Sequence, residues 1–163
     1  MDSPDGREAL GLTSLDGVRI DTFRLRPGDD ASCLNLYQPT NPRVLGVTRE
    51  FASRDRFSFR ASVAQTDAER ANPWLLLQRR FDDGAIPVIA DANSLAYVLH
   101  KAVGEDIEMD GAGGRITLRV VASLADSVFQ RELLMDEQAF LQAFRDQEGY
   151  RLALVEAPPD RMA

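Results

Sequence analysis

The feature that most constrains the fold of this sequence is a pair of alternating segments separated by a glycine-rich turn. Ile107 and Met109 alternate with acidic residues on one side of the turn at 110–114. On the other side every second residue is apolar, at Ile116, Leu118, Val120 and Ala122. Successive side chains of a strand point to opposite faces, so each segment predicts a strand with one apolar face. Because a short turn joins neighbouring antiparallel strands, the pattern predicts a β-hairpin.

Three further segments carry the signals of helices. Asn72 and Pro73 predict a helix start, with Asn72 as the N-cap and Pro73 at the first helical position. A second helix is predicted to run from its cap Asp91 to Gly104, and a third to begin after Asp136. The apolar stripes at helical spacing comprise Leu95, Val98, Leu99 and Ala102 in the second helix and Ala139, Phe140, Ala143 and Phe144 in the third.

Short apolar or alternating runs outside these segments predict additional strands, at 17–25, 44–47, 57–59, 86–90, 133–135 and 150–155. A length of 163 residues favours one domain. The sequence therefore predicts the α+β class, as a single domain of short strands and a β-hairpin packed with about three helices. We place the domain at 11–157, between a flexible N-terminal tail at 1–10 and a C-terminal tail at 158–163.

The charge of the chain argues against a nucleic-acid partner. The formal net charge is −7 at pH 7, and Lys101 is the only lysine. The arginines are scattered, and Arg79 and Arg80 form the only adjacent pair. Since contacts to phosphates need clustered Lys and Arg side chains, we expect no nucleic acid to bind.

The sequence also bears on the compartment. Residues 1–11 are polar and acidic, which is not the pattern of a signal peptide. No stretch approaches the roughly 20 apolar residues that span a bilayer. The single cysteine, Cys33, excludes an internal disulfide and is expected to be a small buried side chain. The sequence as written therefore indicates a soluble chain, and any membrane anchor would lie outside it.

Residues for nucleophilic catalysis are sparse. His100 is the only histidine and falls near the C-terminal end of a predicted helix, beside its apolar stripe. No G-x-S-x-G elbow presents a serine, and nothing in the sequence supplies an electropositive setting for the thiol of Cys33. We therefore interpret His100 as a structural residue at a helix end, and we expect no catalytic residue.

Metal and phosphate sites are likewise not expected. Asp106, Glu108 and Asp110 begin like a calcium loop, but the position that requires a bidentate glutamate holds Thr117. At strand spacing the three acids share the solvent face. The glycines at 111–114 lack the Lys-Ser/Thr of a P-loop and join two strands. One Cys and one His do not furnish a typical zinc site, so we expect neither a metal nor a cofactor.

Three blocks of the sequence carry unusual strings of residues. The first is 27–39, Pro-Gly-Asp-Asp-Ala-Ser-Cys-Leu-Asn-Leu-Tyr-Gln-Pro, followed by the Leu-Gly pair within 42–47. The second runs through 86–107 to a strand at 120–124, and the third covers 124–151. Together these blocks resemble the extracytoplasmic region of bacterial ABC-transporter permeases of the FtsX-like/MacB type. They account for most of the chain and occur in the order of the family. The second block departs from the family in reading Gly-Glu-Asp where Gly-Asp is usual.

The resemblance implies a MacB-periplasmic-domain-like fold without catalytic activity. Such a domain lies between the first two membrane helices, on the extracytoplasmic side of the bacterial inner membrane. A separate subunit hydrolyses the ATP, while the domain couples movement of the membrane helices to a cargo or a partner protein. Lipid, lipoprotein or peptide cargoes are the implied ligands. This interpretation predicts that both ends of the domain emerge on one face.

Two other functions stay open at this stage. The chain would be a free-standing small-molecule-binding protein if Trp74, Tyr37 and Tyr97 lined one pocket, although Trp74 is more typical of a core residue. It would be a hydrolase if His100 and a nucleophile shared a cleft within hydrogen-bond reach.

The permease interpretation also nominates a surface for a partner. Val128, Phe129, Gln130 and Leu133 are the candidate contacts, since the apolar members lie among polar residues in a turn-like segment. The alternative is that the apolar members pack in the core, and the sequence favours this alternative.

Overall fold

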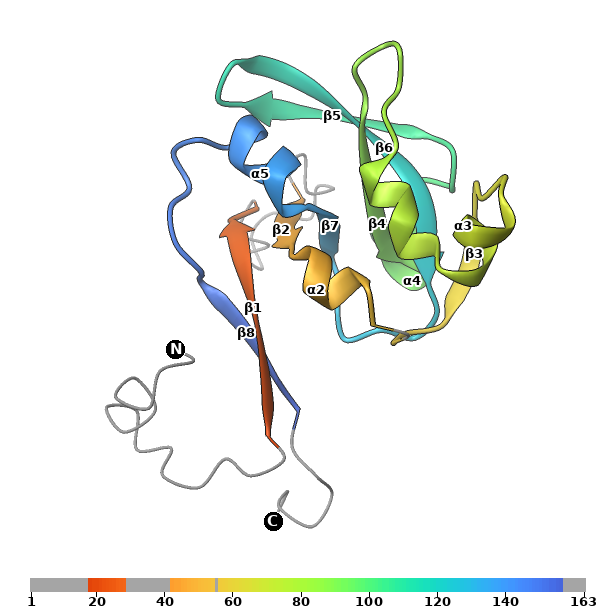
Figure 1. Ribbon diagram of the computed structural model, residues 1–163. Helices are drawn as coiled ribbons and strands as arrows, with labels where there is room; N and C mark the ends of the chain where they lie inside the picture. The colour runs from red at the N-terminus through yellow and green to blue at the C-terminus, as the bar shows by residue number, and fades with distance from the viewer. Residues whose placement is uncertain (1–17, 29–41, 55, 157–163) are drawn as a thin grey trace.

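The computed structural model describes residues 18–28, 42–54 and 56–156 (Figure 1). The strands are β1 Arg19–Arg26, β2 Arg43–Val47, β3 Phe59–Ser62, β4 Ile86–Asp91, β5 Asp106–Gly111, β6 Gly114–Leu124, β7 Glu132–Asp136 and β8 Leu152–Glu156. The helices are α2 Arg49–Ala52, α3 Asp67–Ala71, α4 Ala92–Ser94 and α5 Glu137–Ala143, with a 3₁₀ helix η1 Pro73–Gln78 and a π turn η2 Leu95–Leu99.

The strands form one mixed sheet in the order β3-β6-β4-β7-β2-β1-β8, and β5 pairs with the first half of β6. The pairs β2–β7 and β4–β6 are parallel, and the other pairs are antiparallel. The predicted hairpin is confirmed as β5–β6, in which Ile107 pairs with Leu118 and Gly111 with Gly114. The predicted α+β class is confirmed as well.

Two hydrophobic cores cover the two faces of this sheet. The first contains α2, η1 and an aromatic cluster in which the rings of Phe51 and Trp74 meet edge to face at 5.5 Å. The second contains Phe140 and Phe144 from the α5 segment, Leu95 from η2 and the apolar face of β5. Strands β2, β4 and β7 contribute side chains to both cores. Their sequences are therefore almost continuously apolar, as is usual for strands covered on both faces.

The second predicted helix differs from the expectation. Asp91 does cap α4, but the chain continues as the π turn η2 and ends at His100 in the left-handed conformation, φ 49°, before the predicted end at Gly104. Of the predicted apolar stripe only Leu95 is fully buried, whereas Ala102 is exposed. Leu99 packs against the second core only partly buried, so the burial of this segment does not follow the regular helical period that the stripe predicted.

The other two predicted helices are present, and two short helices were not predicted. Asn72 caps η1, accepting a hydrogen bond from the Trp74 N–H at 3.1 Å, although the helix is 3₁₀ rather than α. Asp136 caps α5, and Phe140 and Ala143 are buried as expected. The additional helices α2 and α3 span four and five residues, which is too short for a periodic signal in sequence. Strand β3 begins at Phe59, so the prediction at 57–59 overlaps it by one residue.

Several predictions concern segments outside the described residues. These are the N-terminal tail at 1–10, the C-terminal tail at 158–163, Cys33, Tyr37 and most of the sequence block at 27–39. The proposed domain limits at 11–157 stay a prediction.

Candidate functional site

Asp106, the first acidic residue of β5, is held by surface ion pairs. Asp106 accepts hydrogen bonds from Arg119 at 2.8 and 2.7 Å, and Arg119 also bonds to Asp83 at 2.8 Å. These bonds hold the pKa of both carboxyls below the ordinary range for aspartate. Ile107 and Met109 lie buried on the opposite face, as the strand interpretation requires. Within 18–28, 42–54 and 56–156, no group of three His, Cys, Asp or Glu side chains is placed to hold a metal ion.

Of the residues named for the two alternative functions, the structure describes His100, Trp74 and Tyr97, and these three do not line one pocket. His100 is exposed at the end of η2. Trp74 is 2% exposed in the first core and donates its ring N–H to the Arg56 carbonyl at 3.3 Å. Tyr97, by contrast, is 78% exposed, and the pocket that it lines does not include Trp74.

The four candidate partner contacts divide into two kinds. Val128 is 65% exposed and Gln130 is exposed, so both are accessible to a partner. Phe129 and Leu133 are buried, with the Phe129 ring edge-on to that of Phe23 at 5.6 Å. These two side chains therefore pack in the core, which is the alternative that the sequence favoured. Whether the segment contacts a partner remains a prediction.

The loop that carries Val128 is tied to the sheet by a buried carboxylate. One oxygen of Asp91 caps α4, and the other accepts hydrogen bonds from the Ser127 N–H at 3.0 Å and its hydroxyl at 3.1 Å. The Arg131 N–H donates to the Ser94 hydroxyl at 2.8 Å at the far end of the loop. The sequence indicates only the cap, because the contact to Ser127 spans 36 residues.

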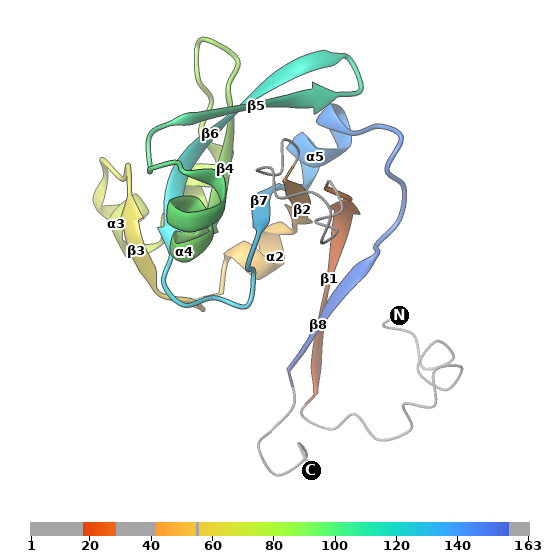
Figure 2. The same cartoon turned by 180° about the vertical axis from the view of Figure 1, so that it is seen from behind.

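The first and last described strands form a two-stranded arm. Residues 19–23 of β1 pair with Leu152–Glu156 of β8, and the last three residues of β1 pair with β2 in the sheet. Both views show the arm projecting away from the body of the molecule (Figure 1, Figure 2). Arg19 pairs with Glu156 at its far end. The predicted emergence of both ends on one face is thus confirmed for the described strands.

Ion pairs connect the arm to the body. Asp21 is a largely buried residue of β1, and its carboxylate accepts hydrogen bonds from Arg54 and Arg56. Arg56 also pairs with Glu156 of β8 at 3.2 Å. The sequence did not indicate this group, because its members are distant along the chain and carry no motif.

A second connection joins β1 to α5 and to the segment before β8. The Arg24 side chain donates to Glu137 at 3.0 Å and lies over the Tyr150 ring at 4.8 Å. The hydrogen bond between Tyr150 and Glu137 raises the pKa of the phenol above its ordinary value of 10.

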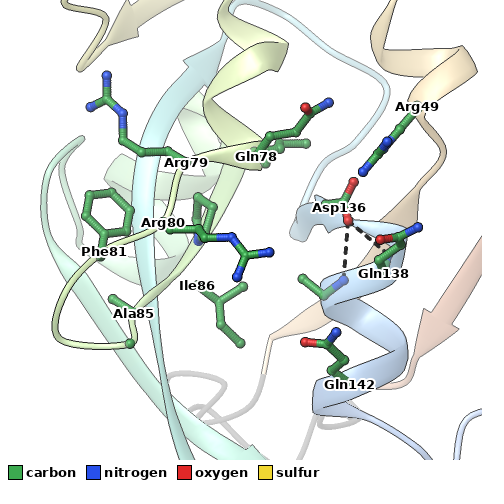
Figure 3. A pocket seen from close by; sticks show the side chains of 14 residues that line it. Arg49, Gln78, Arg79, Arg80, Phe81, Ala85, Ile86, Asp136, Gln138 and Gln142 are labelled. Carbon is green, nitrogen blue, oxygen red and sulfur yellow. Dashed lines mark hydrogen bonds between the residues drawn. The ribbon is translucent and has the colours of Figure 1, made fainter.

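A cleft of about 360 Å³ opens between the η1–β4 connection and the start of α5 (Figure 3). Arg80 reaches into it from one wall and Arg49 from the other (Figure 3). Gln78, Gln138 and Gln142 also line it. Arg79 turns away and pairs with Glu69 at 2.6 Å.

Amide and guanidinium groups predominate among the polar side chains of the described residues that line this cleft. Its single lining carboxylate, Asp136, accepts hydrogen bonds from the N–H groups of Gln138 and Ala139 at 3.0 and 3.3 Å, so it is committed to the helix cap. Among the described residues that line it there is no serine, threonine, cysteine, histidine or tyrosine to act as a nucleophile. The amides and guanidinium groups can donate hydrogen bonds to a polar ligand.

Comparisons with known proteins add one structural likeness. No protein-family model matches the chain, and no curated protein matches it in sequence. A solved structure similar to it is the extracellular domain of the noncanonic ABC-type transporter YknZ from Gram-positive bacteria. The two chains are 14% identical, and the match covers 99% of this chain and 83% of the other with a TM-score of 0.44. At that TM-score the likeness by itself assigns neither a family nor a function.

Proposed function

We propose that this chain is a non-catalytic extracytoplasmic domain of an ABC-transporter permease, which couples movement of flanking membrane helices to a cargo or a partner protein. The resemblance of the three sequence blocks supports this proposal. The structural observation that carries it is the arm, residues 19–23 of β1 with Leu152–Glu156 of β8.

The arm suits insertion between two membrane helices. Paired residues of antiparallel strands lie about 4.5–5.5 Å apart between Cα atoms, so the chain enters and leaves side by side at Arg19 and Glu156. The axes of neighbouring packed helices are about 8–10 Å apart. Two strand ends that lie side by side can therefore connect to two such helices without a long linker. None of the helices in the described part of the chain has the length and apolar character for crossing a bilayer.

The same geometry suits mechanical coupling. Strand β1 is continuous from the arm into the sheet, so a displacement of the arm passes along the β1 backbone to the residues that are hydrogen-bonded to β2. Arg54 and Arg56 fix the arm to the body by holding Asp21. The arm and body are therefore expected to move together rather than about a hinge. The proposed partners are the permease helices and a separate ATP-hydrolysing subunit, with a lipid, lipoprotein or peptide cargo.

Site-directed labelling tests the placement outside the cytoplasm. The test uses cells that express the full-length protein with Cys33 and any cysteine outside this sequence replaced by serine. When the outer membrane is permeabilised, a membrane-impermeant maleimide should label Val128→Cys. Val128 is 65% exposed, so its thiol would be accessible. The matched control is Leu133→Cys, which is fully buried and should stay unlabelled in the folded protein. Labelling of Val128→Cys only after lysis of the inner membrane would refute the proposal.

A further inference from the structure

A groove of about 490 Å³ lies at the end of the sheet opposite to the arm. Strand β3 forms its one side, α4 and η2 the other, and Ser123 of β6 also lines it. Figure 2 shows α4 beside β3 on this face. Most of the lining is apolar, contributed by Ala61, Ala92, Leu95, Ala96, Tyr97, Ala102 and Val103. The groove is distinct from the polar cleft that Arg49 and Arg80 line.

Two irregularities of the backbone border this groove. The register of β3 shifts between Phe59 and Ala61, so Arg60 and Ala61 both line it. The π turn η2 lies opposite and leaves Tyr97 78% exposed. Bulges re-aim side chains, and π turns interrupt the regular helical spacing; both are frequent at functional sites. Neither irregularity is needed to bury Leu95, the one fully buried apolar side chain of this segment.

The charge of the groove is opposite to that of the molecule. The chain has a net charge of −7, yet among the described residues that line the groove the charged ones are Arg60 and Lys101, and none is a carboxylate. Neither cation forms an ion pair within the described part of the chain. The nearby acids have other partners: Glu105 accepts from the Ala102 N–H at 2.6 Å, and Asp106 from Arg119.

We infer that this groove binds an extended peptide segment of a partner protein in which apolar and acidic residues alternate. Apolar residues of such a segment can pack on Tyr97 and Ala61, and acidic residues can reach Arg60 on the β3 side of the groove and Lys101 on the other side. Strand β3 is the end strand of the sheet, which leaves its outer edge available for backbone hydrogen bonds. The choice of a peptide over a membrane lipid rests on the proposed function, because the arm that would lead to the membrane lies at the other end of the sheet.

A binding experiment on the soluble chain tests this inference. The probe is a short fluorescein-labelled peptide in which leucine alternates with glutamate, and the readout is fluorescence anisotropy. The double variant Arg60→Glu/Lys101→Glu should weaken binding about tenfold, because it replaces two attractions by two repulsions. Tyr97→Ala should weaken it about fivefold to tenfold through the loss of aromatic contact area. Backbone amide shifts in an NMR titration should locate to 59–62 and 92–103.

The matched control is Arg80→Glu, which changes the net charge in the same direction but lies in the other cleft. Its affinity for the peptide should stay within about twofold of the wild type. Equal loss in Arg80→Glu and in the double variant would overturn the inference, as would equal binding of a lysine–leucine peptide. Binding of phosphatidylglycerol vesicles in place of the peptide, lost in the double variant, would overturn it in favour of a lipid. This titration can fail while the labelling experiment succeeds, so the two proposals are separable.

Discussion

At the scale of single residues, Asp91 is the least exposed of the buried polar and charged residues that the structure describes. Its side chain is 1% exposed, and its two oxygens serve two separate segments, the start of α4 and Ser127. In Asp91→Asn one oxygen becomes a donor, which leaves a buried N–H without an acceptor. We expect this variant to lower the free energy of unfolding by about 1–3 kcal/mol in urea denaturation.

Asp136→Asn provides the control for this prediction, since Asp136 makes the same cap at α5 without a second contact. Asparagine caps helices about as well as aspartate, so the control should change stability by less than about 0.5 kcal/mol. An Asp91→Asn variant no less stable than the control would contradict a bridging role for the second oxygen.

Because the pKa of Glu69 is lowered in the folded protein, we expect the free energy of unfolding to depend on pH. Hydrogen bonds from the Gln65 and Thr66 N–H groups, at 2.8 and 3.1 Å, and from Arg79 lower its pKa from 4.5 to about 2. The ionised form therefore stabilises the fold above pH 4.5, and this contribution is lost as the pH falls toward 2. The difference in urea midpoint between the wild type and Glu69→Gln should be largest near pH 6 and shrink progressively below pH 4.5. A difference that is constant with pH would exclude this account.

At the scale of elements, the packing of α5 on β2 depends on a glycine. A Cβ added at Gly46 would lie 3.1 Å from Phe140 Cγ and 3.3 Å from Arg24 Cβ, closer than ordinary contacts. Gly46→Ala should destabilise the protein by about 1–3 kcal/mol, measured by thermal or urea denaturation.

Gly113 in the β5–β6 turn is the matched position, because a Cβ there meets nothing within 4 Å. Gly113→Ala should be close to neutral. If crowding against Phe140 is the cause, Gly46→Ala should recover part of its stability in combination with Phe140→Leu. Equal effects of the two glycine substitutions would show that close packing at Gly46 is not the constraint.

At the scale of the whole molecule, we expect the rigidity of the arm to depend on the ion pairs that connect it to the body. Asp21→Asn weakens the charged hydrogen bonds to Arg54 and Arg56. Amides of Leu152–Glu156 that pair with β1 should then exchange with deuterium at least about tenfold faster, while those of β4 are unchanged. Glu50→Gln, which removes only the exposed partner of Arg54, should have little effect on exchange. Uniform acceleration across the sheet would indicate general destabilisation instead.

Local signals predicted the elements whose structure depends on their own residues. The β5–β6 hairpin follows from the alternation around 110–114, and the caps at Asn72, Asp91 and Asp136 form as predicted. Each of these features needs contacts within a few residues of the chain. The same alternation predicted a strand from Asp106, and the structure has β5 there.

The irregular segments were decided by packing. The stripe from Leu95 to Ala102 predicted a regular helix, but the sheet offers contact for Leu95, and the chain adopts a π turn that leaves Tyr97 exposed. The bulge in β3 follows from pairing with β6 and has no signature in its own sequence. The groove between these two irregularities was therefore not predictable from either segment.

The fold class, the hairpin, the helix caps and the family resemblance could be predicted from the amino-acid sequence, because these depend on residue type and spacing over short distances. Only the tertiary structure decided that β2 pairs in parallel with β7, that β1 and β8 leave the body as one arm, and that Asp21 lies between Arg54 and Arg56. Such contacts join residues from 33 to more than 100 positions apart. The free energy of these contacts depends on which faces of the sheet are covered, and no local pattern of residues encodes that choice.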